Sequence, residues 1–179
     1  MSLDFSSSLD KFSSVHAVPP HLDPQNRKIS EIIPGGVILD VPGYLYLGNM
    51  SVGHGKKTLK TYKINVVLNV MMLGSPVRVE GVTYYHVPID EIKDARVIDK
   101  FFPKTNKILD THLSRGHNVF VHCMAGQHRS VAVVVAYLMY SQGMSYERAF
   151  ACIKKRRSAA SKKFLGAMKR YEKGLFKKK

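Results

Sequence analysis

Short runs of apolar residues alternate along this chain with segments whose apolar residues recur at helical intervals. Three short runs predict strands: "NVVLNVMM" and "NVFVHC" are expected to be buried, and "VTYYHVPI" is expected to stop near Pro88. "GGVILDVPGYLYLGNM" predicts two more strands around a Pro-Gly turn. Helical spacing predicts helices in "KKTLKTYKI", "RVIDKFFPKTNKILDTHLSRG", "SVAVVVAYLMYSQG", "SYERAFACIKKRR" and "SKKFLGAMKRYEKGLF". Strands separated by helices predict an α/β fold, with a mostly parallel central sheet covered by helices on both faces.

Local signals set the expected limits of these elements and of the domain. Gly116 is a natural stop for the helix that contains Pro103. Ser145 with Glu147 or one of its neighbours predicts a capping box at the start of a later helix. Residues 1–29 are rich in Ser, Pro and Asp, so we expect an N-terminal extension outside the core. Residues 30–179 are then expected to form one domain.

Composition adds an uneven charge to this picture. The 179 residues carry a net charge of +15, and residues 151–179 hold twelve of the 28 basic residues with Glu172 as their one acid. This basic C-terminal helix is either a solvated face or a docking surface for an acidic lipid or acidic partner. No apolar run approaches the roughly 18 residues of a membrane span, and a secretory signal pattern is missing. We therefore expect a cytoplasmic protein, or one shared with the nucleus.

The stretch "VHCMAGQHRS", residues 121–130, follows a buried strand and leads into a helix. In open α/β sheets this junction binds ligands, and the turn's N–H groups together with the helix N-terminus attract an oxyanion. Gly126 lets the backbone curl closely, and Arg129 can grip two phosphate oxygens with its planar fork. The pattern predicts a phosphate-binding Cys-x5-Arg loop formed by Met124, Ala125, Gly126, Gln127, His128 and Arg129.

Cys123 is expected at the bottom of this loop, where the same field stabilises its thiolate. Cysteines in such settings have pKa values of roughly 3.5 to 7.5 instead of about 8.5. A thiolate that faces a bound phosphate is a nucleophile, so the predicted reaction transfers the phosphoryl group to sulfur and then hydrolyses it. Ser130 is expected to donate its hydroxyl to the departing sulfur, and His122 to set the shape of the loop.

The pattern His-Cys-x-x-Gly-x-x-Arg-Ser, present as "HCMAGQHRS", resembles the signature of the cysteine-dependent protein tyrosine phosphatases. "VAVVVAYLM" is similar to the following helix of their compact, vaccinia-type dual-specificity branch. "YLYLGN", "INVVLNV" and "RRSAASKKFLGAMKRYEKGL" resemble other segments of that branch. The resemblance covers about residues 36–176.

This resemblance implies a general acid, usually an aspartate on the loop after a strand that ends near "IP". In "HVPIDEIKD", the family's usual count of three residues beyond the proline reaches Glu91 instead of an aspartate. Glutamate can transfer the proton because its reference pKa is close to that of aspartate, although its reach differs. Asp90 or Asp94 takes this place if the loop is shifted, so the identity of the acid stays open.

The resemblance also implies the function. The expected activity is a signalling phosphoprotein phosphatase that hydrolyses phosphotyrosine and phosphoserine/phosphothreonine through a cysteinyl-phosphate intermediate, without metal or cofactor. The chain lacks the segment that deepens the pocket of the larger tyrosine-specific relatives, so a shallow pocket is expected. Two alternatives remain open, a phosphoinositide or RNA-end phosphatase with the same loop and a weakly catalytic phosphoprotein-binding module. Homodimerisation through the N-terminal extension is a further expectation.

Other chemistry-bearing residues carry weaker signals. "GHGKKT" does not complete a nucleotide-binding loop, because the first glycine of that motif would fall at Met50. Four histidines, His112, His117, His122 and His128, have no matching cysteine pair, so no metal site is predicted. Cys152 lies among apolar residues of a predicted helix and is expected to pack in the core.

Overall fold

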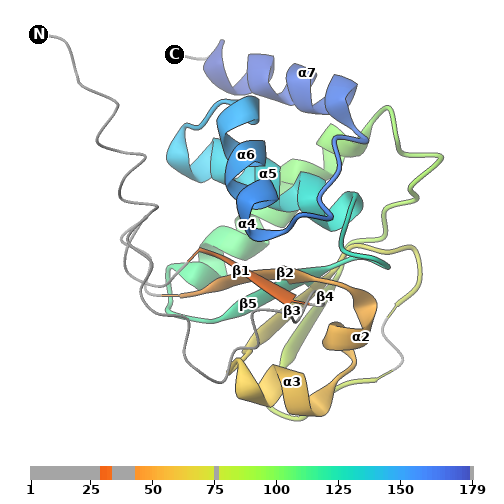
Figure 1. Ribbon diagram of the computed structural model, residues 1–179, viewed down its shortest axis with the longest axis vertical. Coiled ribbons are helices and arrows are strands. Elements are labelled where there is room, and N and C mark those ends of the chain that lie inside the picture. The colour runs from red at the N-terminus through yellow and green to blue at the C-terminus, as the bar shows by residue number, and fades with distance from the viewer. Residues whose placement is uncertain (1–28, 34–42, 75–76, 178–179) are drawn as a thin grey trace, which may run out of the picture.

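The computed structural model describes residues 29–33, 43–74 and 77–177. The expected N-terminal extension, apart from Ile29, lies outside these residues, and so does the strand predicted before the Pro-Gly turn. The expected dimer contact through that extension lies outside them as well. Figure 1 shows one sheet with helices above and below it.

The sheet has five strands in the order β1-β2-β5-β3-β4. Strands β2 (Leu45–Gly48), β5 (Val119–His122), β3 (Val66–Asn69) and β4 (Thr83–His86) run parallel, and β1 (Ile29–Ile33) pairs antiparallel with β2 at one edge. The predicted α/β class with a mostly parallel sheet is confirmed. Strand β1 was not predicted, because the residues up to about 29 were assigned to an extension outside the core, and pairing with β2 is what defines this strand.

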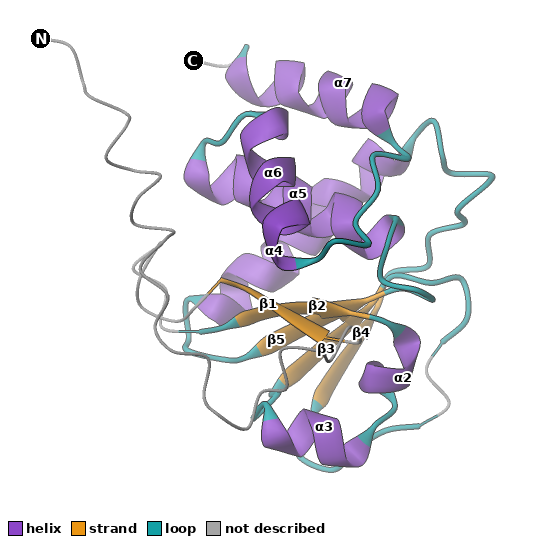
Figure 2. Ribbon diagram, viewed as in Figure 1, coloured by secondary structure: helices purple, strands orange, loops and turns teal. Residues whose placement is uncertain are grey.

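Helices cover both faces of the sheet (Figure 2). One layer holds the 3-10 turn η1 (Ile98–Phe101), α4 (Phe102–Leu113), α5 (Arg129–Gln142), α6 (Tyr146–Arg156) and α7 (Leu165–Phe176). On the other side, the described residues form the short helices α2 (Met50–Gly53) and α3 (Lys56–Thr61). The five predicted helices are present, and Pro103 sits at the first turn of α4, where its missing N–H costs nothing.

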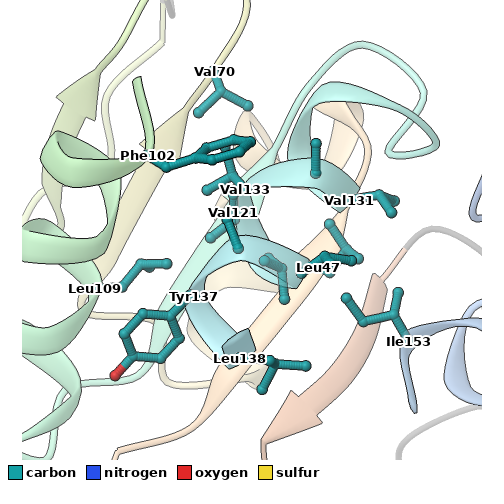
Figure 3. Packing of buried hydrophobic residues seen from close by; sticks show 14 of the residues in the cluster. Leu47, Val70, Phe102, Leu109, Val121, Val131, Val133, Tyr137, Leu138 and Ile153 are labelled. Carbon is teal, nitrogen blue, oxygen red and sulfur yellow. The ribbon is translucent and has the colours of Figure 1, made fainter. Parts of the chain in front are cut away.

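The main core lies between the sheet and α5. Val121 of β5 and Leu47 of β2 face α5, with Leu109 of α4 on one side and Ile153 of α6 on the other (Figure 3). All four side chains are fully buried. Each such side chain contributes roughly 1.5–3 kcal/mol through burial, so the core fixes the position of the segment between β5 and α5.

The ends of α5 and α6 follow local signals, with one correction. Gly143 ends α5 in the left-handed region with φ 61°. The Ser145 side chain caps α6 and accepts a hydrogen bond from the backbone N–H of Arg148. The predicted capping box is wrong, because Glu147 lies one position too early in the helix and pairs with Lys162.

Candidate active site

The predicted phosphate-binding loop joins the carboxyl end of β5 to the start of α5. Gly126 has φ +67°, and a Cβ at this position would lie 2.4 Å from the carbonyl oxygen of Gly48. Only glycine combines that backbone conformation with that close approach. The loop is further held to the neighbouring strand region by a hydrogen bond from the Met50 N–H to the Met124 carbonyl.

Cys123 lies at the base of this loop and is 2% exposed. The Ser130 hydroxyl donates a 3.1 Å hydrogen bond to the Cys123 sulfur. Burial raises the pKa of Cys123. The Ser130 hydroxyl and the backbone N–H groups of Ser130, His128 and Gly126 lower it, and together they outweigh burial, so the pKa lies below its usual value. The sequence predicted that Ser130 lies beside Cys123, and the observed geometry suits a stabilised thiolate.

Arg129 begins α5 and is largely buried. Its Nη1 donates to the carbonyl oxygen of Ile89 at 3.1 Å, and its Nη2 lies 3.2 Å from Glu91 Oε2. Its Nε is buried and has no hydrogen-bond partner among the described residues. The guanidinium is thus fixed from one side while a donor remains for an oxyanion.

A second arginine supports the loop from outside. Arg157 directly follows α6 and is 4% exposed; its Nε donates to the Gly126 carbonyl at 2.5 Å and its Nη2 to the Ala125 carbonyl at 3.1 Å. The N–H of Ser161 donates to the carbonyl of Gln127 at 3.1 Å. Three successive carbonyls are thereby held outside the loop. Sequence reasoning missed Arg157, because nothing in "KKRR" tells which arginine is buried.

His122 is fully buried at the end of β5 and lines the back of the loop. Its Nδ1 lies 3.4 Å from the Cys123 carbonyl oxygen, and Gly53 packs against its ring so closely that a Cβ there would lie 2.7 Å from Nε2. Burial lowers the pKa of His122 to about 4, so the ring is neutral at pH 7. A neutral, tightly packed ring suits the shaping role predicted for it.

The three candidate acids lie on the segment after β4 and differ in their contacts. Glu91 Oε1 lies 2.6 Å from Lys163 Nζ and 2.7 Å from His128 Nδ1, while its Oε2 pairs with Arg129. Asp90 Oδ1 instead accepts two N–H bonds of its own loop, and Asp94 Oδ2 accepts the N–H of Asp90. Of the three carboxylates, Glu91 is the one that contacts the predicted loop.

The ionisation of these carboxylates follows from those contacts. Burial raises the pKa of Glu91, but hydrogen bonds from Lys163 and His128 lower it below its usual value. The backbone N–H groups of Lys93 and Ile92 lower the pKa of Asp90. In the free protein Glu91 is therefore an ionised carboxylate. It pairs with His128, Arg129 and Lys163 at the mouth of the loop.

The remaining candidates lie away from this site. His112 hydrogen-bonds His117 and the Tyr85 hydroxyl, each at 2.9 Å, and Cys152 packs half-buried against the core. Across the described ranges, no group of three or more His, Cys, Asp or Glu side chains could hold a metal ion. No helix within those ranges is long and apolar enough to cross a membrane.

Comparison with known proteins identifies the domain. The family model "Dual specificity phosphatase, catalytic domain" matches residues 45–174. The chain is 32% identical over 117 residues to dual specificity protein phosphatase 1 of Arabidopsis thaliana, covering 65% of this chain and 59% of the relative. Identity to dual specificity protein phosphatase Mpk3 of Drosophila melanogaster is 35% over 126 residues, 69% of this chain and 30% of the relative. This chain thus spans less than two thirds of either relative.

Solved structures agree with this assignment. A mouse putative dual specificity phosphatase complexed with zinc tungstate has a TM-score of 0.69 and 28% identity, covering 75% of this chain and 85% of that chain. The human tyrosine phosphatase-like serine/threonine/tyrosine-interacting protein has a TM-score of 0.65 and 29% identity, covering 82% and 96%.

Proposed function

Since the chain belongs to the dual specificity phosphatase family, we propose that it dephosphorylates proteins at phosphotyrosine, phosphoserine and phosphothreonine through a cysteinyl-phosphate intermediate. The carrying observation is the 3.1 Å contact between the Ser130 hydroxyl and the buried Cys123 sulfur, inside a loop that leads directly into Arg129. A lowered pKa of Cys123 supports a thiolate nucleophile. The similar mouse structure is a complex with zinc tungstate, and tungstate is a tetrahedral oxyanion like phosphate.

The proposed reaction has two steps. In the first, the Cys123 thiolate attacks phosphorus, a P–S bond forms, the P–O bond to the substrate breaks, and Glu91 gives its proton to the departing oxygen. Backbone N–H groups and Arg129 stabilise the charge on the equatorial oxygens. In the second, water attacks phosphorus, the P–S bond breaks, the Ser130 hydroxyl stabilises the departing thiolate, and Glu91 accepts a proton from the water.

Glu91 must be protonated before the first step, although it is ionised in the free protein. A phosphate dianion that binds Arg129 removes one of the cations that hold Glu91, whose Oε2 lies 3.2 Å from Arg129 Nη2. It also adds negative charge beside the carboxylate. Both changes raise the pKa of Glu91 while the substrate is bound, when the proton is needed.

Exposed apolar side chains around the loop support protein substrates. Ile92, Leu73, Met72 and Met124 are 84%, 71%, 50% and 50% exposed, and they follow the carboxyl ends of β4, β3 and β5. We name these four residues the apolar rim. Exposed apolar groups that gather beside a site mark a binding surface, and side chains that flank a phosphorylated residue in a peptide fit it.

We further propose an acidic partner for the basic C-terminal region and a cytoplasmic or nuclear location. Lys155 of α6 and Lys173 of α7 are exposed cations, which supports an acidic partner. Cys123 is a free thiol and the proposed nucleophile, which suits a reducing compartment.

Phosphate release from a panel of phosphopeptides, phosphoinositides and triphosphate RNA tests the proposed function. We expect release from phosphopeptides, inhibition by vanadate, no effect of chelators, complete loss in Cys123→Ser and full activity in Cys152→Ser. If phosphate were released only from phosphoinositides or only from RNA, that class of molecule would replace phosphoproteins as the proposed substrate. Full activity of Cys123→Ser would refute the mechanism.

A further inference from the structure

The segment between α6 and α7 forms one wall of the site and carries a lysine that reaches across it. Lys163 Nζ lies 2.6 Å from Glu91 Oε1, although the two residues are 72 positions apart. The same segment binds the loop backbone through Arg157 and Ser161. Lys163 is therefore attached to a wall that is itself fixed to the phosphate loop.

The two oxygens of Glu91 have different partners. Oε1 contacts Lys163 Nζ and His128 Nδ1, and Oε2 contacts Arg129 Nη2 at 3.2 Å. A substrate phosphate needs Arg129 but not Lys163. Arg129 can therefore exchange Oε2 for a phosphate oxygen while Lys163 keeps its hold on Oε1.

We propose that Lys163 is a positioning residue for Glu91, which it holds at the mouth of the loop while Arg129 exchanges the carboxylate for the phosphate of the substrate. This inference rests on the proposed role of Glu91 as the acid. Without Lys163, a carboxylate displaced from Arg129 keeps His128 alone of its three partners, so we expect it to be held less firmly beside the departing oxygen.

The charged groups around Glu91 determine the direction in which its pKa changes when Lys163 is replaced. Lys163 faces it from the α6–α7 segment, and His128 and Arg129 face it from the loop and the start of α5. On its own segment, Asp90 and Asp94 are engaged with backbone N–H groups, and Lys93 is exposed. Removal of Lys163 takes away a cation that lowers the pKa of Glu91, so its midpoint should rise.

The neighbouring lysine offers a matched control. Lys162 has a similar exposure and makes an ion pair of 2.7 Å, but with Glu147 instead of Glu91. A variant at either position removes one positive charge from the same segment. Any effect of Lys163→Gln that Lys162→Gln does not share therefore belongs to the contact with Glu91.

Carbon-13 NMR of labelled glutamate side chains tests the inference without relying on turnover. The chain has five glutamates, and Glu91→Gln identifies the signal of Glu91. In a Cys123→Ser background, we expect Lys163→Gln to raise the titration midpoint of Glu91, Lys162→Gln to leave it in place, and Lys163→Arg to retain it. An unmoved midpoint in Lys163→Gln would overturn the inference.

The pH–rate profile of the active enzyme then separates this inference from the proposed function. We expect Lys163→Gln to move the alkaline limb to higher pH and to lower kcat about two- to fivefold for a phosphoserine peptide, as loss of one partly exposed ion pair allows. In a Glu91→Gln background the same change should have no such effect. If Glu91→Gln itself leaves the limb in place, the proposed acid is wrong; if it moves the limb and Lys163→Gln does not, the positioning role is wrong.

Discussion

Arg157 Nε lies 2.5 Å from the carbonyl oxygen of Gly126, at the place where that glycine takes its positive φ. A carbonyl held outward turns the adjoining N–H groups toward the interior of the loop, where Cys123 lies. A phosphate would have to meet those N–H groups, so the loop depends on an arginine outside it as well as on Arg129 within it.

Replacement of Arg157 should therefore impair catalysis without removing a catalytic residue. We expect Arg157→Met to lower kcat/KM about 10- to 100-fold, because the loop N–H groups lose their alignment. Loss of the hydrogen bonds to Gly126 and Ala125 should also cost about 2–4 kcal/mol of unfolding free energy, measured by urea denaturation. Arg156→Met, a change at the adjacent and more exposed arginine, serves as control. Equal effects of the two changes would refute the supporting role.

The contact between Ser130 and Cys123 makes a prediction about pH. The Ser130 hydroxyl is one of the groups that lower the pKa of Cys123, so Ser130→Ala should raise it. The rate of alkylation by iodoacetamide should then reach its half-maximum at a higher pH than in the wild type. Turnover of an aryl phosphate should show a burst followed by a slow second step, since the departing thiolate lacks its donor. An unchanged alkylation profile would mean that the hydroxyl does not influence the thiolate.

Local sequence patterns were enough to predict the loop and most elements. Cys123, Gly126 and Arg129 lie within seven positions, so their spacing alone constrains how the backbone meets a phosphate. The continuous apolar runs of β3 and β5 reported strands that are buried along their whole length. These features depend on short-range chain geometry, which the sequence expresses directly.

Contacts between distant parts of the chain were not predictable in the same way. Arg157 and Gly126 are 31 positions apart, and Lys163 and Glu91 are 72 apart. Their meeting depends on how α6 packs against the sheet, and a basic residue in "KKRRSAASKK" has no local mark that shows where it points. The short edge strand β1 was missed for a similar reason, because pairing with β2 defines it.

The identity of the acid can be tested with three matched amide variants. We expect Glu91→Gln to slow hydrolysis of a phosphoserine peptide about 100-fold or more, and of an activated aryl phosphate far less, because the aryl oxygen departs with little protonation. Asp90→Asn and Asp94→Asn should show no such dependence on the leaving group, since these carboxylates accept loop N–H bonds. Leaving-group dependence in either of these variants, with Glu91→Gln like the wild type, would move the acid to that residue.

The apolar rim makes a prediction about substrate size. Leu73→Asp and Ile92→Asp change side chains that are 71% and 84% exposed, so the fold should be unaffected. If these side chains contact residues that flank the phosphorylated one, KM for phosphopeptides with apolar flanks should rise about fivefold, which corresponds to roughly 1 kcal/mol of lost apolar contact. KM for a small aryl phosphate should not change, because that substrate does not extend beyond the loop. Tyr140→Asp changes an exposed aromatic position on α5, 52% exposed, and controls for the added charge. A rise in KM for both substrates would place the effect in the loop itself, and no rise for either would remove the rim from substrate binding.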